Sequence, residues 1–325
     1  MDIAVIGLGL IGGSLLRALA AHGHRVTGYD AAAETREAAR ALAKQAGAPR
    51  SGDAWRVADS VAEAVAGTEV AVLAVPLPAI PGVLAGLAGY PGLITDVTSV
   101  KGPVRDLLDG SRFVGGHPMA GKESSGFPAA DPRLFDGCAW VLCLEPDDPD
   151  PADWLTLARL FTRLGARVVP VTAAEHDRAM AEISHVPHLL AAALSALLAG
   201  NPLAGTLAAG SFRDGTRVAA TRPELIAAMC GGNAPAVRRV LAGVVEDLES
   251  FGRELEHDDP IAALTAGLRA PSELRRGWPP RPGAPVEVPA EVEALLALGR
   301  AGGWVSAIND GTVAGLRPET DRNCS

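Results

Sequence analysis

The sequence predicts an α/β fold in which a doubly wound parallel sheet precedes an all-helical domain and a short C-terminal appendage. In residues 2–171 short apolar segments alternate with helical segments, a pattern typical of a parallel sheet with helices on both faces. After residue 171 only helical periodicity remains, and a Pro-rich linker at 277–283 separates the last stretch. We therefore expect three parts, residues 1–171, 172–273 and 274–325.

The strands of the first part are expected at apolar runs, because a parallel strand buried on both faces is apolar throughout. These runs are 3–6, 25–29, 70–75, 93–99, 113–115, 139–144 and 167–171. The helical segments between the first of these runs are 14–21, 31–45 and 60–66. Each helix then serves as a crossover between parallel strands.

The second part has helical periodicity at 174–198, 224–230 and 234–256. These segments are rich in Ala and Leu, which suits close helix packing. They present more apolar surface than one small domain covers by itself, so we expect a homodimer. The third part has a strand-helix-strand-strand pattern at 286–288, 290–298, 304–308 and 313–316, and its role stays open.

Composition narrows the possible functions. The chain has 325 residues, of which 48% are apolar and 21% charged, as in a globular protein. Its formal charge of −9 leaves no broad basic face for nucleic acid. No uninterrupted apolar run is long enough for a membrane span, and the N-terminal residues do not read as a secretory signal. With four scattered cysteines, which we expect to be reduced, a cytoplasmic location is predicted.

A glycine-rich motif follows the first expected strand. Residues 7–12 read Gly-Leu-Gly-Leu-Ile-Gly, open a helix, and precede Asp30 at the end of the second strand by 18 residues. Gly7 permits a tight turn, Gly9 lets the backbone approach a pyrophosphate, and Gly12 lets helix and strand pack closely. The helix N-terminus offers free N–H groups to the anion. The first part is therefore predicted to be a Rossmann-type dinucleotide-binding domain.

Asp30 indicates NAD rather than NADP, because a carboxylate accepts hydrogen bonds from ribose hydroxyls and repels a 2′-phosphate. Arg36 lies one to two helical turns further on, which leaves a way for a cation to approach the same place. The candidate cofactor-binding residues are Gly7, Gly9, Leu10, Ile11, Gly12, Asp30, Val75, Pro76 and Ser99.

Four further motifs are Asp-Val-Thr-Ser-Val-Lys-Gly at 96–102, Gly-Gly-His-Pro-Met-Ala-Gly-Lys-Glu at 115–123, Ser-His-Val-Pro-His at 184–188 after His-Asp at 176–177, and Phe-Arg-Asp-Gly-Thr-Arg at 212–217. Together with the glycine motif, they resemble the prephenate dehydrogenase (TyrA) family, including its arogenate-using members. The resemblance covers about residues 3–270. Only three of the 29 basic residues are lysines. Two of them, Lys101 and Lys122, flank the stretch that we expect to form the active site.

The resemblance implies NAD-dependent oxidative decarboxylation of prephenate to 4-hydroxyphenylpyruvate in tyrosine biosynthesis. Hydride leaves the carbinol carbon, carbon dioxide leaves the quaternary carbon, and the ring becomes aromatic. The hydroxyl must also lose its proton, and the resemblance makes His117 the acceptor, a task that suits a neutral imidazole. Ser99 then binds the hydroxyl or holds the imidazole; capping of the helix near Gly102 is a compatible role.

The substrate is a dicarboxylate and needs fixed cationic or polar partners. The resemblance assigns these partners to His188 and Arg217, with Lys122, Arg213, Ser184 and His185 as additions. Glu123 is a candidate for the entrance of the site. Relatives often carry a small hydroxyl residue at Lys122 and a lysine at Arg213, so substrate choice among prephenate, arogenate and 4-amino-4-deoxyprephenate stays open.

No metal site is expected. On one straight helix His176 and His188 would be separated by about 18 Å of rise and about 120° of rotation, so they cannot share an ion. The same geometry allows only one of the two to touch a small substrate, unless His176 precedes the helix or Pro187 kinks it. Of the two we favour His188.

Two alternatives come from other classes. An imine or 3-hydroxyacid reductase shares the plan but needs a catalytic lysine or aspartate after residue 171, and no lysine follows Lys122. A non-catalytic NAD-sensing module would keep the glycine motif and use the C-terminal segment as its output. NADP as the cofactor and tyrosine feedback also stay open.

Overall fold

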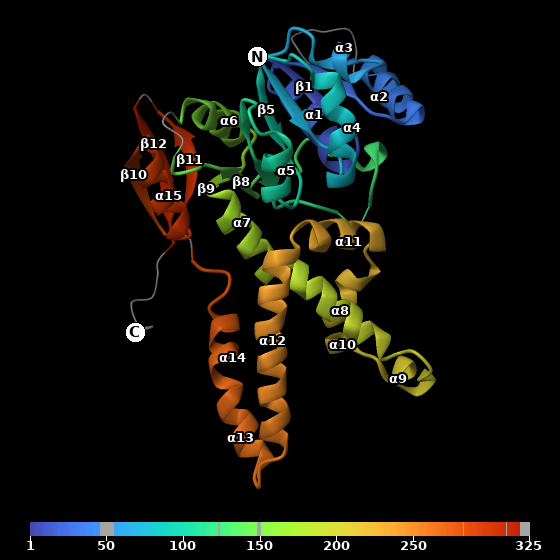
Figure 1. Cartoon of the computed structure of the whole chain (residues 1–325), viewed down its shortest axis with the longest axis vertical. Helices are drawn as coiled ribbons and strands as arrows, with labels where there is room; N and C mark the ends of the chain where they lie inside the picture. The colour runs from blue at the N-terminus through green and yellow to red at the C-terminus, as the bar shows by residue number, and fades with distance from the viewer. Residues whose placement is uncertain (46–54, 123, 148–150, 282, 310, 319–325) are drawn as a thin grey trace. The chain divides into compact units, whose positions relative to one another are not determined.

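The computed structural model describes residues 1–45, 55–122, 124–147, 151–281, 283–309 and 311–318 (Figure 1). The chain divides into two units. The first contains Met1–His176 and Ala284–Arg317, and the second contains Asp177–Gly283. The boundary at Ala284 means that the C-terminal strands belong to the same unit as the N-terminal sheet.

The first sheet of the N-terminal unit is fully parallel, with the order β3-β2-β1-β4-β5-β6. Its strands are β1 Asp2–Ile6, β2 Arg25–Tyr29, β3 Arg56–Val57, β4 Val70–Leu73, β5 Leu93–Asp96 and β6 Phe113–Val114. This order reverses between β1 and β4, which is where α/β sheets of this kind bind their ligands at the carboxyl ends of the strands. The predicted Rossmann-type sheet is confirmed.

Helices cover both faces of this sheet. They are α1 Leu10–Ala21, α2 Ala33–Gln45, α3 Val61–Val65, α4 Ile80–Leu84 and α5 Gly102–Leu107, with 3-10 turns at Leu77–Ala79 and Ala85–Leu87. Successive side chains of a strand point to opposite faces. Accordingly Ile3 and Val5 pack in the apolar cluster under α1, whereas Ala4 and Ile6 pack in the cluster under α3, α4 and α5. The strand is apolar throughout because both faces are buried.

A second sheet is mixed rather than parallel, with the order β10-β12-β11-β9-β8-β7. Its strands are β7 Gly116–Pro118, β8 Ala139–Cys143, β9 Arg167–Val171, β10 Ala284–Pro289, β11 Trp304–Ile308 and β12 Thr312–Arg317. The runs at 139–144 and 167–171 were expected to continue the alternating pattern of the first sheet, and they lie in this second sheet instead. β8 and β9 are parallel because α6, Ala152–Arg163, crosses between them, whereas β7 pairs with β8 antiparallel.

The C-terminal segment completes the second sheet. β11 pairs with β9, and α15, Val292–Arg300, packs against β9. Leu295, Val305 and Val313 are fully buried in the same apolar cluster as Trp140 and Phe161. A segment of this size needs a core supplied by other elements. It is therefore a structural part of the first unit.

The second unit is helical, and its described residues contain no strand (Figure 1). α7, Ala173–Met180, leads into it, and a π-helical turn, Ala181–His185, separates α7 from α8, Val186–Ala196. The other helices are α9 Pro202–Leu207, α10 Gly210–Thr216, α11 Pro223–Gly232, α12 Ala234–Leu255, α13 Pro260–Gly267 and α14 Arg269–Arg276, with a 3-10 turn at Arg217–Ala220.

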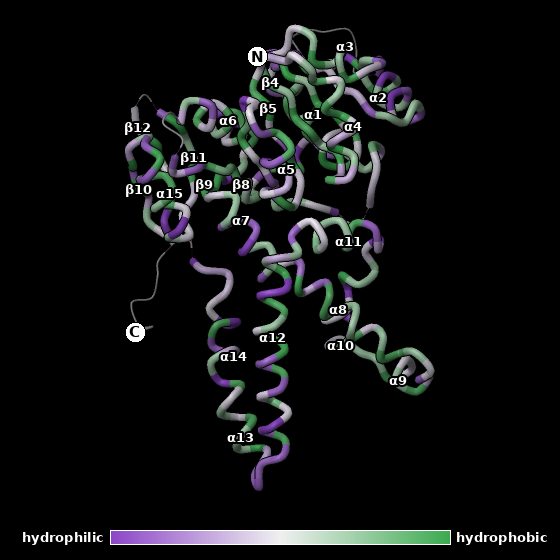
Figure 2. The backbone as a smooth tube through the Cα atoms, in the orientation of Figure 1, coloured by the Kyte–Doolittle hydropathy of each residue, from purple (hydrophilic) through white to green (hydrophobic). Residues whose placement is uncertain are grey.

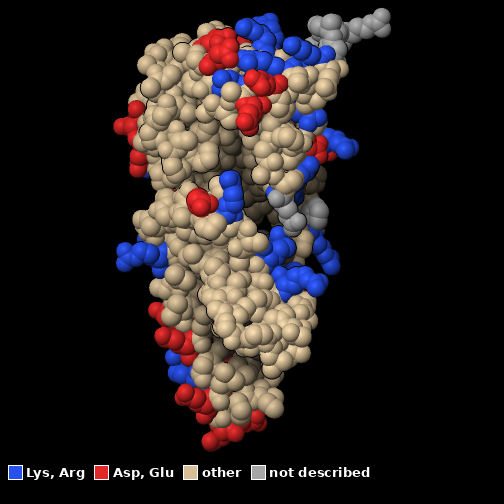
Figure 3. All heavy atoms as spheres, turned by 90° about the vertical axis from the view of Figure 1, so that its right-hand side faces the viewer, with Lys and Arg blue, Asp and Glu red and all other residues tan. Residues whose placement is uncertain are grey.

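Much of the apolar surface of this helical unit is exposed. Its buried cluster is small, around Ala181, Val186 and Val237. Large apolar side chains on α8 and α9 are open to solvent, and the tube in Figure 2 carries apolar stretches along both α8 and α12. In the view of Figure 3, charged side chains lie mainly along the edges and tip of this unit, and the middle of the face is largely uncharged. Among the described residues, no helix combines the length and apolar character needed to cross a bilayer.

Candidate active site

The glycine motif forms the turn between β1 and α1, and its shape leaves room for a ligand. Gly7 has a φ of +98°, and a Cβ there would lie 2.4 Å from the carbonyl oxygen of Ala74. A Cβ at Gly12 would lie 1.8 Å from the carbonyl oxygen of Gly7. At Gly9, by contrast, no atom lies within 4 Å of the added Cβ. The backbone at Gly9 is thus open just where α1 begins at Leu10, which fits a bound pyrophosphate.

Asp30 is fixed beside this turn. Its Oδ2 accepts a hydrogen bond of 2.7 Å from the N–H of Leu8, and its Oδ1 accepts one of 2.9 Å from the N–H of Ala32. A carboxylate has about four acceptor sites, so two backbone donors leave capacity for ribose hydroxyls. The carboxylate is therefore pre-oriented at the end of β2, at the place predicted for it.

Arg36 also reaches this place from α2. Its Nη1 donates to the carbonyl oxygens of Asp30, at 2.7 Å, and Ala31, at 3.0 Å. Its guanidinium lies 5.7 Å from the ring centre of Tyr29 and 3.6 Å from a carboxylate oxygen of Asp59. From the sequence, Arg36 was considered as a cation that could approach a 2′-phosphate. In the structure its guanidinium donates to backbone carbonyl groups directly after β2.

The other candidate cofactor residues lie at the same edge of the sheet. Leu10 and Ile11 form the first turn of α1. Val75 and Pro76 follow β4, and a Cβ on Gly7 would come within 2.9 Å of Val75. Ser99 lies between β5 and α5, is half-buried, and does not cap α5, whose N-cap is Lys101. Its hydroxyl is thus not occupied as a helix cap.

His117 is the central residue of β7 and is half-buried. Its Nδ1 lies 2.9 Å from Nε2 of His176 on α7, with the two rings 5.2 Å apart in an edge-to-face arrangement. His176 is 2% exposed. The sequence placed His176 only among possible metal or substrate ligands and missed this contact, because the two histidines are 59 residues apart.

A buried ion pair holds the backbone directly before His117. Asp96 is the last residue of β5, and its carboxylate forms an ion pair with the ammonium of Lys101. Both side chains are at most 1% exposed. Asp96 Oδ1 also accepts the N–H of Gly116 at 3.0 Å, and Lys101 Nζ donates to the carbonyl oxygen of Gly116 at 2.6 Å. The N–H and the carbonyl group of Gly116 are thus both hydrogen-bonded to side chains at, or directly after, the end of β5. This links β5 to β7 and fixes where His117 projects.

Lys122 lies in the loop that follows β7. Its ammonium forms an ion pair of 2.9 Å with Asp131, and this hydrogen bond lowers the pKa of the Asp131 carboxyl. The N–H of Asp131 in turn donates to Ser14 Oγ on α1 at 2.9 Å. The loop is thereby attached to the helix that begins at the glycine turn. Glu123 lies outside the described residues.

The second unit holds the remaining candidates. His188 on α8 is half-buried, and its Nδ1 lies 2.8 Å from the carbonyl oxygen of Ser184 in the π-helical turn. A carbonyl oxygen can only accept, so Nδ1 of His188 carries the hydrogen in this contact. Nε2 is then the nitrogen left for other partners, and it must also carry a hydrogen to donate to a carboxylate. Arg213 and Arg217 are exposed on α10 and the 3-10 turn after it, and both segments pack against α8.

His185 differs from its neighbours because it is fully buried. Its Nδ1 lies 3.2 Å from Nδ2 of Asn233, which also donates to the carbonyl oxygen of Asp177 at 2.6 Å. Asn233 is 4% exposed and stands between α11 and α12. This arrangement favours a packing role for His185 rather than a contact with substrate.

The π-helical turn removes the premise of one straight helix from His176 to His188. Pro187 has no N–H, and its ring clashes with the carbonyl of the residue four positions earlier in an α-helix. A π-helical turn at Ala181–His185 widens the helix at that point. The run expected to be one helix is thus interrupted by this turn just before Pro187.

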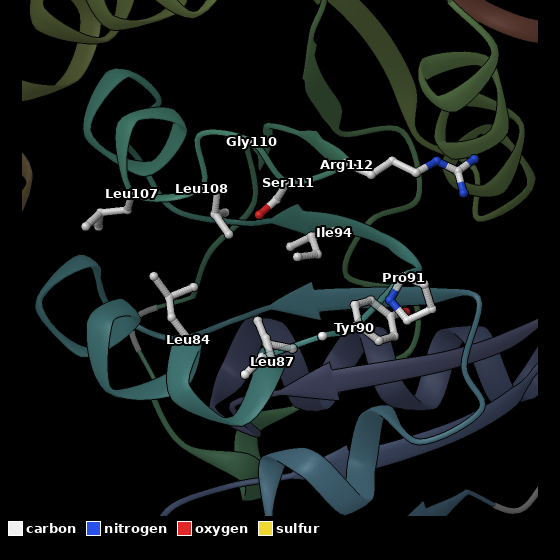
Figure 4. Close-up of a pocket in the computed structure, with 12 residues that line it drawn as sticks. Leu84, Leu87, Tyr90, Pro91, Ile94, Leu107, Leu108, Gly110, Ser111 and Arg112 are labelled. Carbon is white, nitrogen blue, oxygen red and sulfur yellow. The ribbon is translucent and has the colours of Figure 1, made fainter.

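A cavity of about 460 Å³ in the first unit lies away from these residues (Figure 4). Leu84, Leu87, Tyr90, Leu107 and Arg112 line it, among others. It sits where the chain enters β5 and β6, at the amino ends of the strands. None of the candidate site residues lines it. Among the described residues, no group of three or more His, Cys, Asp or Glu side chains is arranged to hold a metal ion.

Comparisons with known proteins cover most of the chain. The family model described as "Prephenate dehydrogenase, nucleotide-binding domain" matches residues 15–170. The model described as "Prephenate dehydrogenase, dimerization domain" matches residues 172–269. Cyclohexadienyl dehydrogenase of Zymomonas mobilis is 35% identical over 275 residues, which make up 79% of this chain and 89% of that protein.

Two solved structures have the same architecture. Arogenate dehydrogenase of Synechocystis is 30% identical, with a TM-score of 0.72, and the match covers 86% of this chain and 100% of that one. Prephenate dehydrogenase of A. aeolicus, in complex with hydroxyphenyl propionate and NAD+, is 25% identical, with a TM-score of 0.70. That match covers 84% of this chain and 98% of the other.

Proposed function

The chain belongs to the prephenate dehydrogenase family, and we propose that it catalyses the NAD-dependent oxidative decarboxylation of prephenate to 4-hydroxyphenylpyruvate. The observation that carries the proposal is the position of His117, held by the buried Asp96–Lys101 pair on a strand that follows the dinucleotide sheet. A half-buried imidazole there is a suitable proton acceptor.

Residues of the first unit would hold the cofactor. The open backbone at Gly9 and the first turn of α1 suit the pyrophosphate, and Asp30 suits the ribose hydroxyls of NAD. NAD, when bound, accepts the hydride that leaves the carbinol carbon. The NAD+ in the related structure of A. aeolicus supports the same cofactor here.

His117 manages one proton. Nε2 of His117 takes the proton of the ring hydroxyl as hydride departs. Loss of carbon dioxide then leaves its electron pair in the ring, which becomes aromatic, and the imidazolium returns the proton to the phenolate oxygen. Ser99, whose hydroxyl is not used as a helix cap, would hydrogen-bond the substrate hydroxyl or the imidazole. The chain therefore supplies positioning and one reversible proton transfer.

The carboxylates of the substrate need cationic partners, and the motifs at 184–188 and 212–217 offer His188 and Arg217 for this role. Arg217 offers a planar guanidinium that suits a carboxylate, and His188 offers Nε2 once both ring nitrogens carry protons. Arg213 and Ser184 are further candidates beside them. Lys122 is available only when its ion pair with Asp131 opens.

The substrate within this family is the finer question. The similar protein of Zymomonas mobilis is named cyclohexadienyl dehydrogenase, and the one of Synechocystis is an arogenate dehydrogenase. Prephenate and arogenate differ in the side chain on the quaternary carbon, and 4-amino-4-deoxyprephenate differs at the ring hydroxyl. The proton-accepting role of His117 requires that hydroxyl, so we favour the first two over the amino analogue.

The test offers prephenate, arogenate and the amino analogue separately with NAD and with NADP, and follows absorbance of the reduced cofactor. We expect oxidation of prephenate with NAD, at a kcat/KM above that for the other pairs. Preference for arogenate would correct the substrate and keep the reaction. Failure with all three acids would reject the proposal.

We also propose that the helical unit forms a homodimer. The matching family model is described as a dimerization domain, and the exposed apolar side chains on α8 and α9 need cover. A groove of about 370 Å³ in the same unit is lined by Arg178 and Arg239 together with Glu182 and Asp247. Cations and anions side by side in one groove suit a two-fold contact, where the same surface faces itself.

A further inference from the structure

The contact between His117 and His176 joins the proposed proton acceptor to a second, buried imidazole. The two atoms in contact are Nδ1 of His117 and Nε2 of His176, 2.9 Å apart. His176 is 2% exposed, so its ring is held by packing. Nothing in the proposed reaction so far uses this second ring.

Only one hydrogen fits between the two nitrogens. The nitrogen to which it is covalently bonded decides whether Nε2 of His117 can accept a proton from the substrate. If Nε2 of His176 carries it, neutral His117 accepts it at Nδ1 and has its own proton on Nε2, where it cannot take another. If Nδ1 of His117 carries it, Nε2 of neutral His117 is unprotonated and can accept a proton. The first arrangement blocks proton transfer from substrate at Nε2, and the second permits it.

We propose that His176 is a positioning residue that holds neutral His117 in the tautomer with its proton on Nδ1. This inference rests on the proposed function. His176 then carries its own proton on Nδ1 and accepts from His117 through Nε2. When His117 takes the substrate proton on Nε2, the same contact becomes a charge-assisted hydrogen bond that stabilises the imidazolium. No proton is lost in this scheme, because His117 returns it to the product.

Both rings are mounted on rigid parts of the first unit. A capping box begins α7: Glu175 accepts the N–H of Thr172 at 2.9 Å, and Thr172 Oγ1 accepts the N–H of Glu175 at 3.1 Å. Arg300 on α15 donates to Glu175 at 2.6 Å. Burial alone would raise the pKa of Glu175, but these hydrogen bonds lower it. The helix turn that carries His176 is thus fixed from two sides.

Charged groups on the elements that carry the two rings pair with one another. Asp96 and Lys101 face Gly116 and pair with each other, and Glu175 beside His176 pairs with Arg300. A carboxylate in the position of His176 would stabilise the imidazolium of His117 more strongly than a neutral imidazole does, so that His117 would return the proton less readily. A neutral acceptor steers the tautomer and leaves the proton on His117 free to return.

The direct test reads the tautomer by NMR. In the full-length protein labelled with ¹⁵N, two-bond ¹H–¹⁵N correlations distinguish a protonated from an unprotonated ring nitrogen, and His117→Asn identifies the signals of His117 by their loss. We expect neutral wild-type His117 to carry its proton on Nδ1. In His176→Leu, which removes the acceptor and keeps an apolar side chain, we expect the Nε2-protonated form to gain population.

Kinetics provide the second readout. His176→Leu is expected to lower kcat by about 10- to 100-fold, a part of the 10² to 10⁴ that a general base contributes, with the KM for substrate within about threefold. His176→Gln keeps a carbonyl oxygen as acceptor and is expected to stay within about fivefold of wild-type kcat. The thermal midpoints of both variants show whether they are folded.

Three results would overturn the proposal. The first is a proton on Nε2 of neutral His117 in the wild type, a measurement that needs no variant to fold. The second is an equal kcat in His176→Leu and the wild type. The third is an equal loss of kcat in the Leu and Gln variants with a raised KM, since that indicates a structural role. The tautomer is read without substrate, so it is separable from the proposed function, which fails only if no cyclohexadienyl acid is oxidised.

Discussion

Single residues of this site depend on partners that are distant in the sequence. Glycines at 7–12 and Asp30 were predicted from a local pattern, because each is required by the geometry of one turn. His117 was predicted from a motif. Its two supports, Lys101 through Gly116 and His176 directly, were noted in the sequence without these roles, because a contact across 15 or 59 residues requires knowledge of how the elements pack.

The Asp96–Lys101 pair yields a prediction about stability. Lys101→Met removes the ammonium and leaves the buried carboxylate of Asp96 without its counter-ion, so we expect a loss of about 3–5 kcal/mol in the free energy of unfolding. Urea unfolding followed by circular dichroism measures it. Lys44→Met, at an exposed position on α2, is the matched control and should change stability by less than about 0.5 kcal/mol. Equal urea midpoints for the two variants would contradict this account.

Asp30 yields a prediction about the cofactor. Asp30→Ser removes a charged acceptor for the ribose hydroxyls and a negative charge that repels a 2′-phosphate. Hydrogen bonds to charged groups contribute about 1.5–3 kcal/mol, so affinity for NADH should fall by about 10- to 100-fold. The preference for NADH over NADPH should fall as well, with Arg36 already at this place. Fluorescence titration measures both affinities, with Glu34→Ser on exposed α2 as control. An unchanged preference would disprove the role.

At the scale of elements, periodicity predicted most helices and strands but not how they group. The run at 174–198 was expected to be continuous, whereas the structure inserts a π-helical turn before Pro187. Hydrophobic periodicity does not resolve one added residue in a turn. The strands at 139–144 and 167–171 likewise have the apolar character of parallel strands, and β8 and β9 do pair in parallel. Their sequence does not specify that they lie in a second sheet.

The packing of α15 on β9 can be tested at one glycine. A Cβ at Gly299 would lie 1.7 Å from the carbonyl oxygen of Pro170, so Gly299→Ala must push the helix away from the strand. We expect it to destabilise the protein by at least about 2 kcal/mol, as overpacking does. Gly252→Ala in α12, where no atom lies within 4 Å of the added Cβ, should instead stabilise by about 0.5–1 kcal/mol. If thermal unfolding shows the same sign for both, the tight contact is not as described.

At the scale of the whole molecule, the division into a nucleotide-binding unit and a helical unit was predictable, because it follows from the change of periodicity after residue 171. The return of the chain to the first unit at Ala284 was not predictable. A short strand-helix-strand-strand pattern indicates that it needs a partner core, but not which one. The buried Leu295 and Val305 show that the core is that of the second sheet.

The homodimer has its own test. Leu197 and Leu203 are 65% and 67% exposed on the helical unit, next to other apolar side chains. Replacing both with Glu should raise the dissociation constant of the dimer at least about 100-fold, because burying unpaired carboxylates is costly. Sedimentation velocity measures the dimer, with Leu107→Glu on the first unit as control. A wild-type monomer, or a double variant that still sediments as a dimer, would contradict the proposed interface.

His117 is where the account can be tested most directly, by the initial rate of NADH formation from prephenate in the wild type and in His117→Asn, together with the dissociation constant of NAD for each. Removing the proton acceptor should lower kcat by about 10² to 10⁴ and leave the affinity for NAD within about threefold. A variant that keeps kcat within tenfold of the wild type would show that the proton is taken elsewhere.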